Sequence, residues 1–273
     1  MKNFSELGLS EAVAIAIAEL GFEKPTPIQS QVIPAMLESA KDLIALAQTG
    51  TGKTAAFGIP LVELIDTSAK KPQALVLAPT RELCVQIEND LKAFSAKTKH
   101  FYTVAVYGGA NIRTQIDQLR KGVQVVVATP GRLIDLLGRR AVDLSQIKYL
   151  VLDEADEMLN MGFQEDIDEI LSTTPKEKVT WLFSATMPTE IKSISKKYMK
   201  SPMEISAGNV NQTNANIEHQ YYLVQPKNKY AALKRILDYN PDIYGIIFCR
   251  TKAETQEIAE KLIKDGYNAD SLH

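Results

Sequence analysis

Short apolar runs alternate with amphipathic stretches along most of the chain after residue 42. The runs are rich in Val, Ile, Leu or aromatic residues, as buried strands are. They cover residues 42–47, 73–79, 102–107, 123–129, 148–152 and 179–183. The stretches between them have helical periodicity, over 54–65, 82–94, 112–120, 132–137, 165–171 and 190–198. Apolar strands separated by helices predict an α/β fold, with a parallel sheet covered by helices on both faces.

A polar, Asn-rich stretch interrupts this pattern and predicts an interdomain linker over residues 208–218. We therefore expect a first domain over residues 1–207. The alternation resumes with predicted strands at 219–224 and 244–249 and predicted helices at 229–239 and 253–265. The remaining stretch of about 55 residues is short for a complete α/β domain, so residues 219–273 are expected to form part of a second one.

Composition adds a few limits to this picture. The chain has 273 residues, 45% of them apolar and 23% charged, with a formal net charge of −2. This balance is typical of a globular protein and gives no global basic signature, although a local basic groove remains compatible with it. The start has no secretory signal, and the apolar stretch 12–20, capped by Ser10, predicts a helix too short to span a membrane.

The cysteines and histidines point to no metal or redox site. Cys84 and Cys249 lack paired spacing, which favours two reduced thiols in a cytoplasmic protein. His100, His219 and His273 have no metal-ligand spacing.

A Gly-rich loop follows the first predicted strand and leads into a helix. Its residues are Gln48, Thr49, Gly50, Thr51, Gly52, Lys53 and Thr54. Glycines let backbone amides turn toward a polyphosphate, and the lysine can reach the β- and γ-phosphates while the Thr54 hydroxyl binds Mg²⁺. Ala47 stands where the usual motif has its first glycine. The alternative is a strand–helix turn without a ligand.

Two acidic residues, Asp153 and Glu154, lie at the end of the fifth predicted strand. Carboxylates there are well placed to face the phosphate loop, because the carboxyl ends of parallel strands share one edge. Asp153 can hold Mg²⁺, partly through water, and Glu154 can polarise an attacking water, with Lys53 completing the catalytic set. The alternative is a solvated acidic turn that caps the next helix.

Asp153-Glu154-Ala155-Asp156 resembles the signature of DEAD-box ATP-dependent RNA helicases. The resemblance extends over nearly the whole chain, with further motifs in the family's order, and is closest to bacterial members of the cold-shock type. These motifs are Phe22–Gln29 within a Q-motif region of residues 2–30, Pro79-Thr80-Arg81-Glu82-Leu83, Gly108-Gly109, Thr129-Pro130-Gly131-Arg132, Ser184-Ala185-Thr186, and residues 246–251 in the second domain.

The resemblance implies a RecA-like P-loop domain with distinct roles for its motifs. Adenine recognition is implied for Phe22, Lys24 and Gln29. RNA contact is implied for Pro79, Thr80, Arg81, Gly108, Gly109, Thr129, Pro130, Gly131 and Arg132, at a different part of the strand ends from the nucleotide. Coupling between the sites is implied for Ser184, Thr186 and Asp156. For Thr80 and Thr129, the starts of helices explain the residues equally well.

The implied function is local unwinding of short RNA duplexes, without sequence preference, coupled to ATP hydrolysis with Mg²⁺. The family's arginine finger belongs to a segment later than His273, so these 273 residues are expected to bind ATP but to hydrolyse it weakly. A non-catalytic RNA clamp or scaffold and a DNA-directed motor remain as alternatives. Membrane contact is not expected, and ribosomal or RNA-degradation partners are left open.

Overall fold

The computed structural model describes residues 3–39, 41–206 and 217–272. The chain divides into two compact units, Met1–Gln212 and Thr213–His273, each described by itself below. The predicted linker at 208–218 lies almost wholly outside the described residues, so its boundaries remain predictions.

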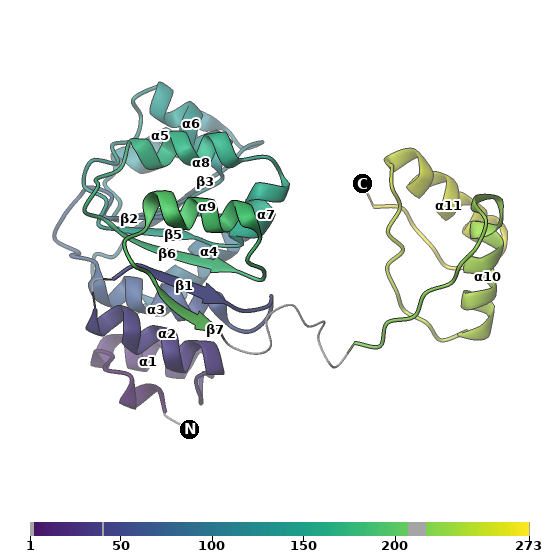
Figure 1. The fold of residues 1–273 in the computed structure, drawn as a ribbon, viewed down its shortest axis with the longest axis horizontal. Helices are drawn as coiled ribbons and strands as arrows, with labels where there is room; N and C mark the ends of the chain where they lie inside the picture. The colour runs from purple at the N-terminus through teal and green to yellow at the C-terminus, as the bar shows by residue number, and fades with distance from the viewer. Residues whose placement is uncertain (1–2, 40, 207–216, 273) are drawn as a thin grey trace. The chain divides into compact units, whose positions relative to one another are not determined.

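The first unit is built on a seven-stranded sheet in the order β3-β4-β2-β5-β6-β1-β7, and every pair in it is parallel (Figure 1). The strands are β1 (Leu43–Leu46), β2 (Ala74–Leu77), β3 (Thr103–Val106), β4 (Val125–Ala128), β5 (Tyr149–Leu152), β6 (Val179–Ser184) and β7 (Met203–Ser206). The first six match the predicted runs, and the predicted fold class is confirmed.

Helices cover both faces of this sheet (Figure 1). Their bounds are η1 (Phe4–Glu6), α1 (Glu11–Glu19), α2 (Pro27–Glu38), α3 (Lys53–Leu64), α4 (Arg81–Phe94), α5 (Ile112–Arg120), α6 (Pro130–Gly138), α7 (Ala155–Asn160), α8 (Gln164–Ser172) and α9 (Thr189–Tyr198). Side chains of alternate strand residues enter two separate cores. Leu43 packs with α1 to α4 on one face, and Ile44 packs with α6 to α9 on the other. Trp181 is fully buried in the first core.

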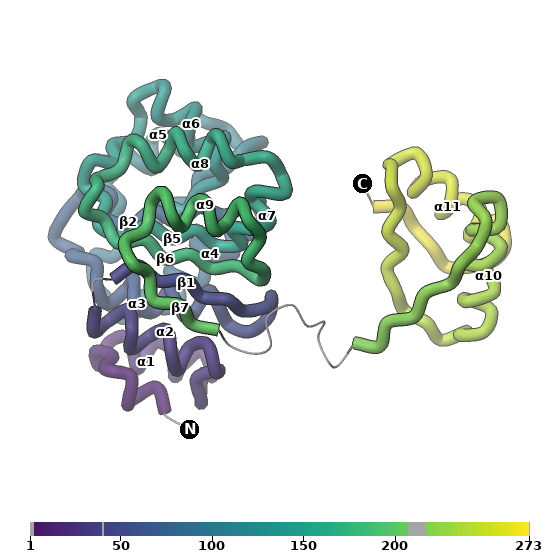
Figure 2. Tube along the Cα trace, in the orientation of Figure 1, coloured from purple at the N-terminus to yellow at the C-terminus, as the bar shows by residue number. Residues whose placement is uncertain are grey.

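Strand β7 was not predicted, because its pattern lacks an apolar run. Only Ile205 among its four residues is buried. β7 lies at the edge of the sheet beside β1, and Figure 2 shows how the green end of the first unit returns to the purple start. An edge strand with one buried side chain gives a weak sequence signal, since its partner comes from a distant part of the chain.

Helices α2 and α7 also escaped prediction. α2 starts at Pro27 and contains Pro34, and a proline inside a helical pattern reads as a helix breaker in a sequence. Its start is nevertheless well defined, because Thr26 and Gln29 form a capping box. α7 has only six residues, too few to show a period.

The second unit has two helices, α10 (Lys229–Tyr239) and α11 (Lys252–Lys264), after a short 3₁₀ turn, η2 (Pro226–Asn228). The predicted helices are confirmed, but the predicted strands at 219–224 and 244–249 are wrong, since the described residues form no strand there. Leu223 and Phe248 are 94% and 91% exposed. A strand exists only through ladder hydrogen bonds to a neighbour, and apolar sequence alone cannot supply that neighbour.

A buried carboxylate, Asp42, ties the start of β1 to two later segments. It is 6% exposed, and its Oδ1 accepts a hydrogen bond from the Thr180 amide at 2.7 Å. Its Oδ2 accepts from the Lys200 amide, just before β7. One side chain thus fixes β6 and the approach to β7 against β1.

Replacing Asp42 with Ala should lower the free energy of unfolding by about 3 kcal/mol, because the two amides lose their acceptor in a buried site. Urea denaturation measures the loss. The matched control is Asp143→Ala, which removes an exposed carboxylate bonded to the Ser145 amide and should cost less than about 1 kcal/mol. Equal losses for the two variants would contradict the role of Asp42.

Candidate functional site

The sheet order separates the predicted site residues into two groups along one edge. Parallel strands present all their carboxyl ends on the same side. The phosphate loop, the acidic pair and the Ser184 segment follow β1, β5 and β6, which are neighbours in the sheet. The predicted RNA residues follow β3, β4 and β2, which are also neighbours. The two groups meet where β2 pairs with β5.

Backbone geometry in the phosphate loop requires glycine at two positions. Gly50 and Gly52 have φ of 80° and 91°, in the left-handed region that other residues rarely adopt. Gly52 is the N-cap of α3, and Lys53 is the first residue of that helix. Thr51 closes the loop by donating to the Gln48 carbonyl at 2.7 Å. The loop therefore ends at a helix N-terminus, where backbone amides favour an anion.

The Q-motif residue Gln29 is joined directly to this loop. Its Nε2 donates to the Gly52 carbonyl at 3.1 Å, and its Oε1 accepts from the Thr26 amide at 2.9 Å. Gln29 is 2% exposed, so these bonds satisfy a buried amide. One N–H and one lone pair of the amide take part in neither bond. Gln29 thus braces the phosphate loop and keeps one donor and one acceptor for a further ligand.

The other predicted adenine contacts lie nearer the surface. Phe22 is half-buried and packs edge-on against Phe4 and Phe94, with ring centroids 5.9 and 6.0 Å away. Lys24 is exposed. No bond joins either side chain to the loop, so their predicted role stays a prediction.

Two buried charged groups lie together at the carboxyl ends of β1 and β5. We call the part of the edge formed by β5, β6 and β1 the nucleotide half. The Lys53 side chain is 7% exposed, and its Nζ has no hydrogen-bond partner among the described residues. Asp153, 2% exposed, is close enough for the Lys53 charge to act on it. Burial raises the pKa of Asp153 to about 6; Lys53 opposes the rise, and Glu154 adds to it.

This arrangement fits the predicted ligands, ATP and Mg²⁺. A buried ammonium without a partner is unfavourable unless an anion joins it, and a triphosphate supplies one. A buried carboxylate with a raised pKa is stabilised as an anion by a cation beside it. Mg²⁺ takes phosphate and water ligands around one or two protein groups, so one buried carboxylate beside a phosphate loop is a donor set that fits this ion.

Glu154 has a strained backbone. Its φ of 48° and ψ of 51° place a non-glycine residue in the left-handed region, at the N-cap of α7. This conformation costs about 1–2 kcal/mol in an L-residue. Strain of this kind often marks a functional side chain that the fold holds in one direction.

The predicted coupling residues are partly bonded to one another. Asp156 Oδ2 accepts from the Thr186 amide at 2.9 Å and from the Thr186 hydroxyl at 2.8 Å. These bonds join α7, which carries the acidic motif, to the segment after β6. Ser184 makes no such bond: its hydroxyl is buried, without a partner among the described residues. Of the three residues with an implied coupling role, Asp156 and Thr186 are therefore bonded to each other and Ser184 is not.

In the other half of the edge, the two predicted arginines differ in their contacts. Arg81 is exposed, with its guanidinium 5.0 Å from the centre of the Tyr107 ring. Arg132 is half-buried and donates to the Ala110 carbonyl and to Gln115 Oε1. Thr80 caps α4 by accepting from the Leu83 amide at 3.2 Å, so its helix-start role is present. Thr129 is the N-cap of α6 without a side-chain bond.

The sequence interpretation missed Gln115, which is 3% exposed and lies between these two loops. It belongs to no recognised motif, and a glutamine on an amphipathic helix carries no signal that separates it from a surface residue.

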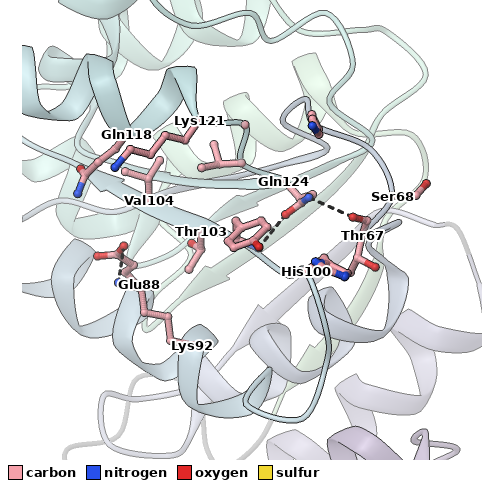
Figure 3. Close-up of a pocket in the computed structure, with 14 residues that line it drawn as sticks. Thr67, Ser68, Glu88, Lys92, His100, Thr103, Val104, Gln118, Lys121 and Gln124 are labelled. Carbon is pink, nitrogen blue, oxygen red and sulfur yellow. Dashed lines mark hydrogen bonds and ion pairs between the residues drawn. The ribbon is translucent and has the colours of Figure 1, made fainter.

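A cavity of about 730 Å³ lies outside both groups of site residues. Figure 3 shows its lining, which includes Thr103 at the start of β3 and Gln124 just before β4. It therefore opens at the amino ends of these strands, the edge opposite the phosphate loop.

The remaining predictions concern thiols and membranes. Cys84 is fully buried, and burial, helped by the charges of Glu82 and Asp153, raises its pKa to about 12, so it is not a nucleophile at neutral pH. Cys249 is half-buried. In the part of the chain that the structure describes, no helix is both long enough and apolar enough to cross a bilayer.

The raised pKa of Asp153 predicts how stability depends on pH without nucleotide. A carboxyl whose folded-state pKa exceeds its ordinary value of 3.8 stabilises the fold below that value, and this stability is lost as pH rises toward about 6. The wild type should therefore lose on the order of 2 kcal/mol between pH 4 and pH 7 relative to Asp153→Asn. Urea denaturation across this range measures the difference, with exposed Asp117→Asn as control. Parallel curves for wild type and Asp153→Asn would contradict it.

Comparison with known proteins gives one consistent family. The DEAD/DEAH box helicase family matches residues 26–194. The chain is 47% identical to the ATP-dependent RNA helicase CshA of Limosilactobacillus reuteri, over 99% of this chain and 54% of that protein. It is also 47% identical to the DEAD-box ATP-dependent RNA helicase CshA of Geobacillus kaustophilus, over 100% of this chain and 58% of that protein. The chain spans about half the length of these relatives.

A solved structure agrees with the sequence relatives. The crystal structure of a DEAD box protein from the hyperthermophile Methanococcus jannaschii is similar, with a TM-score of 0.73 and 44% identity, over 99% of this chain and 72% of that one. With the strand order and the acidic motif already described, these matches show that the chain belongs to the DEAD/DEAH box helicase family.

Proposed function

We propose that this chain binds ATP and acts on RNA as part of an ATP-dependent RNA helicase. The observation that carries the proposal is the buried Lys53 ammonium, without a partner among the described residues, beside the buried Asp153 carboxyl. A structural lysine would have an acceptor or reach solvent. Relatives named ATP-dependent RNA helicases make ATP and RNA the ligands to test first.

In this proposal the nucleotide half of the edge positions ATP. The amides of residues 50–54 and the Lys53 ammonium bind the phosphates, and Gln29 offers its remaining donor and acceptor to adenine. Thr54 and Asp153 would hold Mg²⁺, which neutralises phosphate charge when bound. Glu154 orients and polarises the attacking water as a general base.

The part of the edge formed by β3, β4 and β2, which we call the RNA half, binds the sugar–phosphate backbone of RNA. Arg81 and Arg132 supply guanidinium groups suited to phosphate. The Gly108-Gly109 turn has no side chains, so an RNA strand can approach the protein main chain closely there. Contacts of this kind carry little sequence information. We infer binding without sequence preference and local separation of short duplexes.

The Asp156–Thr186 hydrogen bonds support a link between ATP state and RNA state. They connect the segment after β6 to α7, whose N-cap is Glu154; in the sheet, β6 lies between β5 and β1. A change in charge beside Glu154, such as the loss of a phosphate, would therefore act on the hydrogen-bonded pair Asp156 and Thr186. We also propose that these 273 residues bind ATP but turn it over slowly.

Lys53→Met should weaken binding of a fluorescent ATP analogue on the order of 100-fold, because the charge-assisted bonds to phosphate are lost. Its free energy of unfolding without nucleotide should not fall, since a methionine buried at this site needs no partner. Titration and urea denaturation give the two values. The control, Lys70→Met, changes an exposed lysine at the opposite edge and should leave affinity unchanged. Equal affinity of Lys53→Met and wild type would remove the phosphate role.

Glu154→Gln should separate binding from catalysis. In a protein extended to the length of its relatives, ATP analogue affinity should persist, while RNA-stimulated turnover should fall by about 10²- to 10⁴-fold. Phosphate release measures turnover, and Glu157→Gln, an exposed acid in the same helix, is the control. Unchanged turnover would exclude Glu154 as the base; absent turnover in the unaltered protein would instead favour a non-catalytic clamp.

A further inference from the structure

Gln115 is a buried glutamine whose carboxamide joins two loops. It lies on α5, which follows the Gly108-Gly109 turn. Its Nε2 donates to the Tyr107 carbonyl at 3.2 Å, and its Oε1 accepts from Arg132 Nη1 at 2.7 Å. These bonds connect the end of β3 to the start of α6.

Arg132 holds the glycine turn from both sides. Its Nη1 and Nη2 both donate to the Ala110 carbonyl at 3.2 Å, after the two glycines. Through Gln115 it is also tied to Tyr107, just before them. Neither its Nε–H nor the second Nη2–H is used in these bonds, so the guanidinium keeps donors for another acceptor.

Tyr107 also contacts Arg81, which follows β2, the strand beside β4. Arg81 lies over the Tyr107 ring, and a Cβ added at Gly109 would be 3.7 Å from Arg81 Nη1. Tyr107 therefore meets Gln115 through its carbonyl and Arg81 through its ring. A shift of the Tyr107 backbone would move the ring against which the Arg81 guanidinium packs.

We propose that Gln115 is a positioning residue that sets the relative geometry of Arg81, Arg132 and the Gly108-Gly109 turn for binding a nucleic-acid phosphate backbone. This inference rests on the proposed RNA function and assigns part of it to a residue outside the recognised motifs. Arginine binds phosphate best when its planar group is already oriented, because less entropy is lost on contact. A carboxamide, with one donor and one acceptor arm, is suited to hold a carbonyl and a guanidinium at once.

The plainer interpretation is that Gln115 only satisfies buried polar groups. Gln124 is the matched control for it. This glutamine is 2% exposed, accepts from the Tyr102 amide at 2.8 Å and donates to the Ala69 carbonyl at 2.7 Å. It lies at the opposite edge, beside the cavity of Figure 3, and joins two segments as Gln115 does.

The experiment compares Gln115→Met with Gln124→Met, since methionine keeps the side-chain length but removes both bonds. Fluorescence anisotropy with a labelled single-stranded oligouridylate measures RNA affinity of the 273-residue chain, and a fluorescent ATP analogue measures nucleotide affinity. Gln115→Met should bind RNA on the order of tenfold more weakly, with ATP analogue affinity within about twofold of wild type. Gln124→Met should lose comparable stability but keep its RNA affinity.

Equal RNA affinities of Gln115→Met and wild type, or equal losses in the two variants, would overturn the positioning role. A wild-type chain that fails to bind RNA at low salt would instead overturn the proposed RNA function, and this inference with it.

Gln115→Glu provides a second test that retains a polar side chain of the same shape. Glutamate still accepts from Arg132 but cannot donate to Tyr107, and its charge offsets that of Arg132. The slope of log affinity against log salt should become shallower by about 0.7, one phosphate contact on a single strand. An unchanged slope would mean that the Arg132 guanidinium beside this position contacts no RNA phosphate, and it would contradict the proposal even if Gln115→Met failed to fold.

Discussion

A lysine ammonium buried beside a buried carboxyl is the constraint around which the nucleotide half of this protein is arranged. Lys53 and Asp153 come from segments 100 residues apart and meet only because β1 and β5 flank β6 in a parallel sheet. Keeping these charges from water is unfavourable without an additional ionic partner. The cores on both faces of the sheet, the hydrogen bonds of Asp42 and the glycines of the phosphate loop hold the two groups in place despite this cost.

Much of the first unit follows from sequence because its strands are buried on both faces. Runs such as that of β4 (Val125–Ala128) have no polar face to obscure them. The failures occur where tertiary context decides the outcome. β7 depends on β1 for its identity, and α2 overrides its own prolines through packing and a capping box. In the second unit, the apolar stretches around Leu223 and Phe248 have the composition of strands but pair with no described neighbour.

The loops that carry the candidate site residues were predictable where the sequence signal is local. Glycines before a lysine, and acidic residues after an apolar run, are recognisable from their order in the sequence alone. The bonds of Asp156 to Thr186 were anticipated only in outline, since a sequence does not say which hydroxyl reaches a carboxylate. The role of Gln115 had no signal, because its meaning lies in two partners from other elements, Tyr107 and Arg132.

The close contact between Gly52 and Gln29 links two positions that are 23 residues apart. A Cβ built on Gly52 would lie 2.4 Å from Gln29 Nε2, a separation that real side chains do not tolerate. A side chain at position 52 would therefore displace the Gln29 carboxamide, in addition to the strain of a left-handed backbone at that position. The turn that would hold the phosphates and the residue proposed to read the base thus share one packing constraint, so a change of side chain at either position disturbs both.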